Sequence, residues 1–192
     1  ILTLSLAFLN INNKVSASTY YTSSELEVVG AQVRTSGNAG IRFIAQINDY
    51  DTSEVQEYGI ILAFGLAKAD ENFVIGGTVN GTDVYGKTVS ETNEGRFSLT
   101  LYNIPEKYYG QLVSARSYVI DDGNVVYSDS VVTRSLAQVI KAAINEGNES
   151  DYVLGINQIV NNMYTNVDVI FDTEEIVFPI TGEDLNCEPQ YV

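Results

Sequence analysis

Apolar and polar positions alternate with a period of two along much of the first 135 residues, as they do in strands that bury one face. The alternation in 31–34 and 41–47 keeps one parity, and the intervening residues 35–40 are all of types that favour turns. This pattern predicts a hairpin. Upstream of it the parity reverses, so we expect a β-bulge near Val29-Gly30.

Further strands follow with different burial patterns. Residues 58–66 are apolar on both faces, which is typical of a central strand, whereas 96–102 alternate and predict a strand with one solvent-facing side. Residues 111–120 and 125–132 flank an Asp-Gly pair, a strong signal for a two-residue hairpin turn. With Asp122 and Gly123 as the loop residues, facing positions sum to 245.

That register makes several pairs across the predicted hairpin. Tyr118 faces Tyr127 on one side of the ribbon, and Arg116 faces Asp129 on the same side. Val119 faces Val126 on the other side, where β-branched residues suit a core.

The period changes to 3.6 after residue 134, which predicts helices over 135–144 and 151–164. The helical faces that we expect to be buried carry Leu136, Val139, Ile140, Ile156, Ile159, Val160 and Met163. A last hairpin is expected from 167–171 and 176–180, and residues 183–192 look like a polar tail. The fold class is therefore mainly β: one antiparallel β-sandwich domain over 18–182 with two short C-terminal helices.

The first nine residues, ILTLSLAFL, are almost wholly apolar, but they are fewer than the ~20 residues that span a bilayer. Val15-Ser16-Ala17 supplies small or aliphatic residues at the positions that signal peptidase prefers. We therefore expect residues 1–17 to be a signal peptide and the protein to be secreted or extracellular. The alternatives are a buried strand or an uncleaved anchor.

Composition excludes several chemistries. The chain of 192 residues has no His and one Cys, so it lacks histidine-activated nucleophiles, histidine metal ligands and an internal disulfide. Its 10 Lys and Arg residues stand against 25 Asp and Glu residues, and a formal net charge of −15 argues against binding to nucleic acid.

A set of short motifs in 30–136 resembles an uncharacterised module type of secreted and cell-surface proteins from Gram-positive, often gut, bacteria. The motifs are Gly30-Ala31-Gln32-Val33-Arg34, Gly40-Ile41-Arg42-Phe43, Tyr58-Gly59, Ala115-Arg116-Ser117-Tyr118, Tyr127-Ser128 and Arg134-Ser135-Leu136. The resemblance covers a little over half the chain and implies export, an immunoglobulin-like β-sandwich and a neighbourhood of surface or glycan-handling proteins. It implies no catalytic residues.

Two groups of side chains are candidates for ligand binding. Arg34 and Arg42 share the polar face of the first hairpin, which suits either an anionic ligand or an acidic residue from a neighbouring element. Tyr102, Tyr118 and Tyr127 have outward parity, and flat aromatic rings stack on sugars; Arg116 lies beside two of them. The alternative is that these rings and Arg116 only hold the hairpin together.

Asp49, Asp51 and Ser53 place oxygen atoms at alternate positions of one loop, a spacing that calcium sites use. The glycine and the closing acid of the usual calcium loop are missing, so a plain acidic turn is the alternative.

These features favour a non-catalytic secreted or cell-surface module that binds a glycan or a surface protein. A secreted carbohydrate-active enzyme that uses two paired carboxylates is an alternative, and so is a purely structural exported domain.

Overall fold

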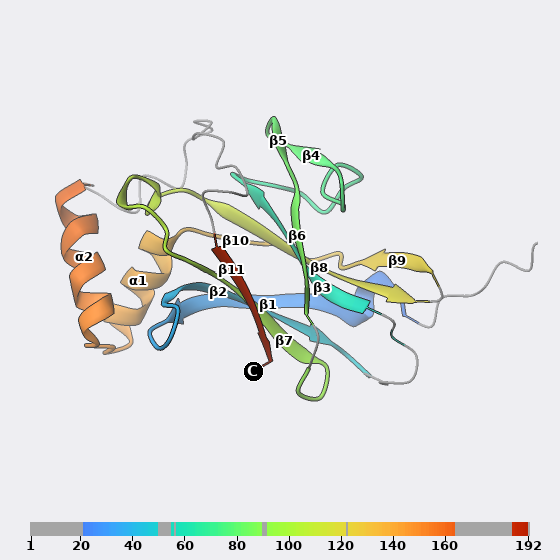
Figure 1. The fold of residues 1–192 in the computed structure, drawn as a ribbon, viewed down its shortest axis with the longest axis horizontal. Coiled ribbons are helices and arrows are strands. Elements are labelled where there is room, and N and C mark those ends of the chain that lie inside the picture. The colour runs from blue at the N-terminus through green and yellow to red at the C-terminus, as the bar shows by residue number, and fades with distance from the viewer. Residues whose placement is uncertain are drawn as a thin grey trace, which may run out of the picture.

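The computed structural model describes residues 21–49, 55, 57–89, 92–121 and 123–163, and the backbone of 186–191. Two antiparallel sheets pack face to face as a β-sandwich, and two helices lie at one end of it (Figure 1). The predicted signal peptide, residues 1–17, and the predicted hairpin of 167–171 and 176–180 lie outside the described residues.

The two sheets have four and five strands. Sheet A has the order β1-β2-β7-β11, formed by β1 (Leu26–Arg34), β2 (Gly40–Ile47), β7 (Arg96–Tyr102) and β11 (Asn186–Tyr191). Sheet B has the order β10-β8-β3-β6, with β9 also paired to β8, formed by β3 (Glu57–Phe64), β6 (Tyr85–Val89), β8 (Val113–Asp121), β9 (Asn124–Tyr127) and β10 (Val132–Arg134).

The smaller elements are a two-stranded ribbon, two 3₁₀ turns and two helices. They are β4 (Thr78–Val79), β5 (Thr82–Asp83), η1 (Ser23–Glu25), η2 (Glu106–Tyr108), α1 (Leu136–Asn145) and α2 (Asp151–Met163). No helix among the described residues is long and apolar enough to cross a membrane.

Both predicted hairpins are present, and the register predicted for the second is confirmed along β9. In the first, β1 pairs with β2, and the register shifts between Val28 and Gly30, where the parity of the sequence reverses. In the second, Tyr118 pairs with Tyr127 and Val119 with Val126, as the Asp-Gly turn predicts. A turn of fixed length sets the pairing of every residue that follows it, so this register was readable from the turn alone.

The main core lies between the inward faces of the two sheets. Its largest fully buried members are Tyr21, Leu26, Ile41, Phe43, Ile47, Ile60, Leu62, Phe97, Leu99 and Leu101. The strand β3 is buried along nearly its whole length, as the apolar run predicts for a central strand.

The expectation that β7 has one solvent-facing side is wrong. Ser98 and Thr100, its polar alternate residues, are both fully buried. The strand has a paired neighbour on each side, β2 and β11, and short hydroxyl side chains in the middle of a sheet are easily shielded.

The polar tail at 183–192 is also corrected, because 186–191 pair with β7 as an antiparallel strand. Cys187, Pro189 and Tyr191 take the register positions opposite Leu101, Leu99 and Phe97, the core-facing residues of β7. The segment therefore alternates with a period of two, although its core-side positions hold Cys, Pro and Tyr instead of the usual aliphatic residues. A proline is tolerated because β11 forms the edge of the sheet.

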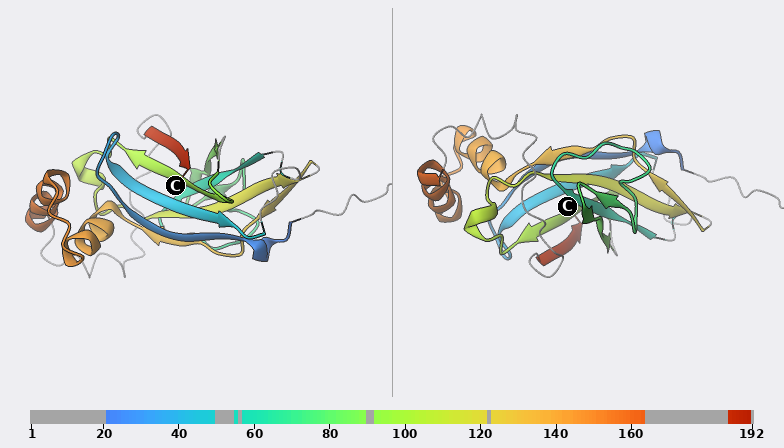
Figure 2. Two further views of the ribbon diagram at one scale, coloured as in Figure 1. Left: turned by 90° about the horizontal axis from the view of Figure 1, so that it is seen from below. Right: turned by 90° about the horizontal axis from the view of Figure 1, so that it is seen from above.

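The two predicted helices are present and pack together at one end of the sandwich (Figure 2). Ser135 caps α1: its hydroxyl accepts from the Gln138 N–H at 3.2 Å, and the Gln138 side chain accepts from the Ser135 N–H at 2.9 Å. Two of the expected core residues of α2 differ: Ile159 is only partly buried against the core, and Met163 is 44% exposed because it is the last residue of the helix, past Val160.

Candidate functional site

The outward face of sheet B is covered by residues 65–84, which we call the strap. Under the strap lies a second, smaller core whose buried members are Ile61, Ala63, Phe73, Val84 and Tyr118. Because this face is packed against apolar side chains from the strap, it is interior and offers no open surface at those positions.

A tight turn fixes the strap to the sheet. Asn80 and Gly81 both have positive φ angles, 51° and 77°, as the turn between β4 and β5 requires. The Asn80 side-chain amide donates hydrogen bonds to the carbonyl oxygens of Phe64 and Leu66, each at 2.9 Å. This Asn-Gly pair is the signal in the sequence that would have predicted the ribbon.

Arg116 of β8 binds the strap through hydrogen bonds. It is only 7% exposed, and its guanidinium donates to the Ser128 carbonyl at 2.7 Å, the Asp70 carbonyl at 3.0 Å and the Phe73 carbonyl at 2.9 Å. Burial lowers the pKa of Arg116, and the negative charge of Asp129 opposes that shift. Three carbonyl acceptors take the place of the water that the buried cation has lost.

The two tyrosines of the β8–β9 hairpin complete this cluster. Their rings lie 6.2 Å apart between centroids, and the Arg116 guanidinium lies 5.1 Å from the Tyr127 centroid, a cation–π distance. The Tyr127 hydroxyl accepts from the Ile75 N–H of the strap at 3.0 Å.

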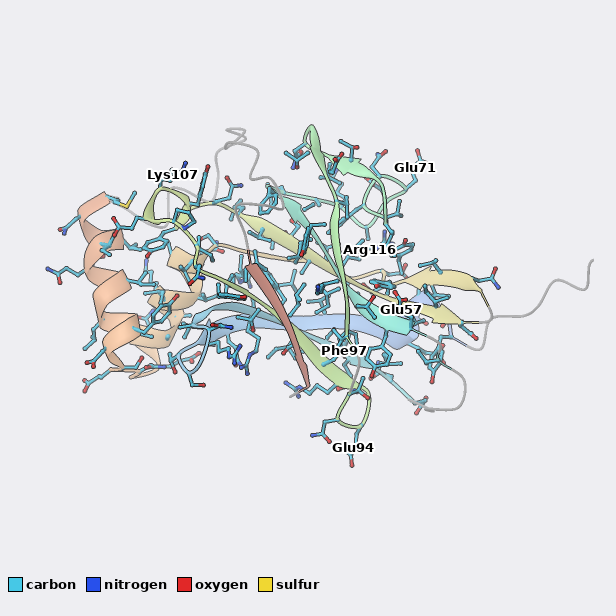
Figure 3. All side chains as sticks on the ribbon, viewed as in Figure 1. Glu57, Glu71, Glu94, Phe97, Lys107 and Arg116 are labelled. Atoms are coloured by element: carbon cyan, nitrogen blue, oxygen red, sulfur yellow. The ribbon has the colours of Figure 1, made fainter. Side chains whose placement is uncertain are left out.

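Tyr118 is 2% exposed, and its hydroxyl donates to a carboxylate oxygen of Glu57 at 2.9 Å. Arg116 and Glu57, both labelled in Figure 3, come from the neighbouring strands β8 and β3. Burial raises the pKa of Tyr118 to about 12. Its ring lies over Gly59, where an added Cβ would stand 2.8 Å from the ring and its hydroxyl.

The structure thus brings Arg116, Tyr118 and Tyr127 together, but their polar atoms make hydrogen bonds to other parts of the protein. The geometry favours the alternative in which these three residues hold the hairpin and its cover. Tyr102 is not part of this cluster, because it belongs to β7 in the other sheet.

The remaining candidates share the outward face of sheet A. Arg34 and Arg42 are not directly opposite one another: Arg42 pairs with Gln32, two residues before Arg34, so the arginines are diagonal neighbours. Diagonal positions lie roughly 7–8 Å apart, close enough for both guanidinium groups to reach one anion.

Tyr102 joins this face through Gly40. Gly40 pairs with Arg34 on one side and with Tyr102 on the other, so an arginine and a tyrosine flank a position that has no side chain. Arg34, Arg42 and Tyr102 are all half-buried. We call these three residues, with Gly40 between them, the arginine face.

The second row of the arginine face runs from Arg42 to Thr100. Thr100 is fully buried, and its hydroxyl oxygen makes no hydrogen bond. Glu188 of β11 takes the next register position, opposite Thr100. The backbone register thus places Arg42, Thr100 and Glu188 in one row across three strands.

The calcium hypothesis is not tested. Asp49 is exposed with a φ of 52°, a conformation that aspartate tolerates in turns, and Asp51 and Ser53 lie outside the described residues. Within the described part of the chain, no group of three or more acidic or cysteine side chains is arranged to hold a metal ion.

Comparison with known proteins finds no family model, no curated protein and no solved structure that matches this chain. The arguments for its function are therefore those of its own geometry.

Proposed function

We propose that this protein is a non-catalytic exported module, secreted or held at the cell surface, that binds a glycan or a surface protein through the arginine face. One observation carries the proposal. Arg34, Arg42 and Tyr102 are half-buried together on one sheet face, so two guanidinium groups and an aromatic ring share one surface.

The strand order supports an immunoglobulin-like interpretation of the sandwich. Constant-type immunoglobulin domains place their first, second, fifth and fourth strands in one sheet and their third, sixth and seventh in the other. Here β1, β2 and β7 follow the order of the first, second and fifth strands, and β11 takes the edge position that the fourth strand has in those domains. In the other sheet β3, β8 and β10 follow the order of the third, sixth and seventh strands, with β6 on the outer side of β3. This argument is an analogy of fold, and such sandwiches serve many functions.

The chemistry of the arginine face suits polar ligands. A guanidinium offers several donors in a fixed plane and forms paired hydrogen bonds with a carboxylate or with neighbouring hydroxyls. A tyrosine ring offers an apolar face for stacking and a hydroxyl for hydrogen bonding. Sugars and peptide segments both carry hydroxyl or carboxylate groups that a guanidinium binds, and apolar surfaces on which a tyrosine ring stacks.

Binding of the chain from residue 18 onward to a glycan array, with and without calcium, tests the proposal. We expect retention of a restricted set of glycans, and the variant Arg34→Gln/Arg42→Gln should lose at least about tenfold in affinity. Lys87→Gln/Arg134→Gln is the matched control, because it removes two positive charges from exposed sites on sheet B.

Four outcomes would contradict the proposal or direct it elsewhere. Equal loss in Lys87→Gln/Arg134→Gln would show that only net charge matters. A large drop in thermal stability of the double variant, with unchanged affinity, would assign the arginines to an intramolecular ion pair. Release of shortened glycans would favour the carbohydrate-active enzyme, and no binding to glycans or to cell-surface protein would favour a purely structural domain.

A further inference from the structure

The side-chain amide of Asn80 has a fitted position where the strap leaves β3. Its nitrogen donates to the carbonyl oxygens of Phe64 and Leu66, so each amide hydrogen has an acceptor. A Cβ added at Gly65 would stand 2.7 Å from this nitrogen, so the absence of a side chain at residue 65 makes room for the amide. The turn between β4 and β5 is thereby tied to the first residues of the strap.

Asn80 and Gly81 form the only Asn-Gly pair in the sequence. In such a pair the backbone nitrogen of the glycine attacks the side-chain carbonyl carbon of the asparagine, because glycine has no side chain to hinder the approach. The new N–C bond closes a cyclic imide, the proton of that nitrogen passes to the amide nitrogen, and ammonia leaves. Water then opens the ring at either carbonyl, which gives aspartate or isoaspartate.

The closed strap opposes this reaction. Attack requires the Asn80 side chain to turn away from its two acceptors and toward the Gly81 nitrogen, whereas the turn holds these residues at φ angles of 51° and 77°. The Thr82 hydroxyl donates to the Val79 carbonyl at 2.9 Å and holds the same turn. Although Asn80 is exposed to water, it therefore reacts from a conformation in which the strap has opened.

The two products do not fit the position of the amide. A carboxylate at residue 80 has no hydrogen to donate, so its oxygens would face the carbonyl oxygens of Phe64 and Leu66 and repel them. Isoaspartate lengthens the backbone by one carbon, which a two-residue turn between β4 and β5 does not accommodate. Because ammonia has left, the amide does not form again.

We propose that Asn80 is a deamidation site, that opening of the strap controls its reaction, and that the product prevents the strap from closing again. The strap is suited to open by itself, because its buried residue Phe73 belongs to the second core and not to the main core. Opening uncovers the outward side of β3, where Ile61 and Ala63 are now buried.

Peptide mapping by mass spectrometry of the full chain, kept in mildly alkaline buffer with and without urea, measures the reaction. We expect aspartate and isoaspartate at residue 80, formed at least about tenfold more slowly in the folded protein. Phe73→Ala should speed the reaction of the folded protein at least about tenfold, because it weakens the second core and leaves Asn80 in place. Leu136→Ala is the matched control: it removes a side chain from the main core and should leave the rate nearly unchanged.

A second pair of variants tests the effect of the product. Asn80→Asp should speed hydrogen–deuterium exchange of the strap at least about tenfold. Asn72→Asp places the same charge at another exposed asparagine of the strap and should leave this exchange nearly unchanged.

Three results would overturn the proposal. Equal rates with and without urea, or no product at Asn80 in either buffer, would remove the controlled site. Equal acceleration by Phe73→Ala and Leu136→Ala would show that unfolding of the whole domain, and not of the strap, controls the reaction. Equal exchange in Asn80→Asp and Asn72→Asp would show that the product leaves the strap closed.

Discussion

At the scale of single residues, Arg116, Tyr118 and Tyr127 show what a local sequence pattern predicts and what it does not. The turn at Gly123 predicts that the two tyrosines pair on one face, and they do. The turn contains no information about what covers that face. The cover is the strap, which begins about fifty residues earlier in the chain, and its packing depends on contacts that no local pattern encodes.

The buried tyrosines predict how stability depends on pH. Burial raises the pKa of Tyr118 and of Tyr152 to about 12, from an ordinary value of 10.0. Between these values the unfolded chain loses the phenolic protons while the folded chain keeps them, so the unfolded state is favoured as pH rises. The stabilisation is complete below pH 10 and is lost as pH rises through about 12.

Denaturant unfolding at several pH values above 9.5 measures this loss. Tyr118→Phe should make the decline above pH 10 shallower. It should also lower the free energy of unfolding at neutral pH by about 1.5–3 kcal/mol, because it removes the hydrogen bond to Glu57. A decline of the same steepness in Tyr118→Phe and in the wild type would contradict the assignment.

At the scale of elements, sequence periodicity predicts what depends on a regular pattern. The bulge at Gly30, the register of the β8–β9 hairpin and the positions of α1 and α2 follow from period and turn chemistry. The errors occur where burial depends on neighbours. The hydroxyls of β7 are buried because β11 pairs beside them, and β11 was missed because its alternate positions hold Cys, Pro and Tyr.

The helices supply a matched pair of core and surface substitutions. Leu136 is 2% exposed, so Leu136→Ala should lower the free energy of unfolding by about 2–5 kcal/mol. Met163→Ala removes a side chain that is 44% exposed and should change it by less than about 0.5 kcal/mol. Chemical denaturation monitored by circular dichroism compares them. Equal effects would mean that α1 is not anchored in the core as described.

At the scale of the whole molecule, the outward faces of the two sheets differ. Sheet B has its outward face closed by the strap, whereas sheet A carries the arginine face. The helices lie at one end of the sandwich, and the first described residues lie at the other, beside the β8–β9 hairpin (Figure 2).

Hydrogen–deuterium exchange with and without a bound glycan or surface protein tests the central claim most directly, because it locates the ligand on the fold. The account predicts slower exchange in the loop between β1 and β2 and in the residues that follow Tyr102, with the strap and β9 unchanged. Slower exchange confined to the strap and β9, with the β1–β2 loop unchanged, would contradict the assignment of the binding surface to sheet A.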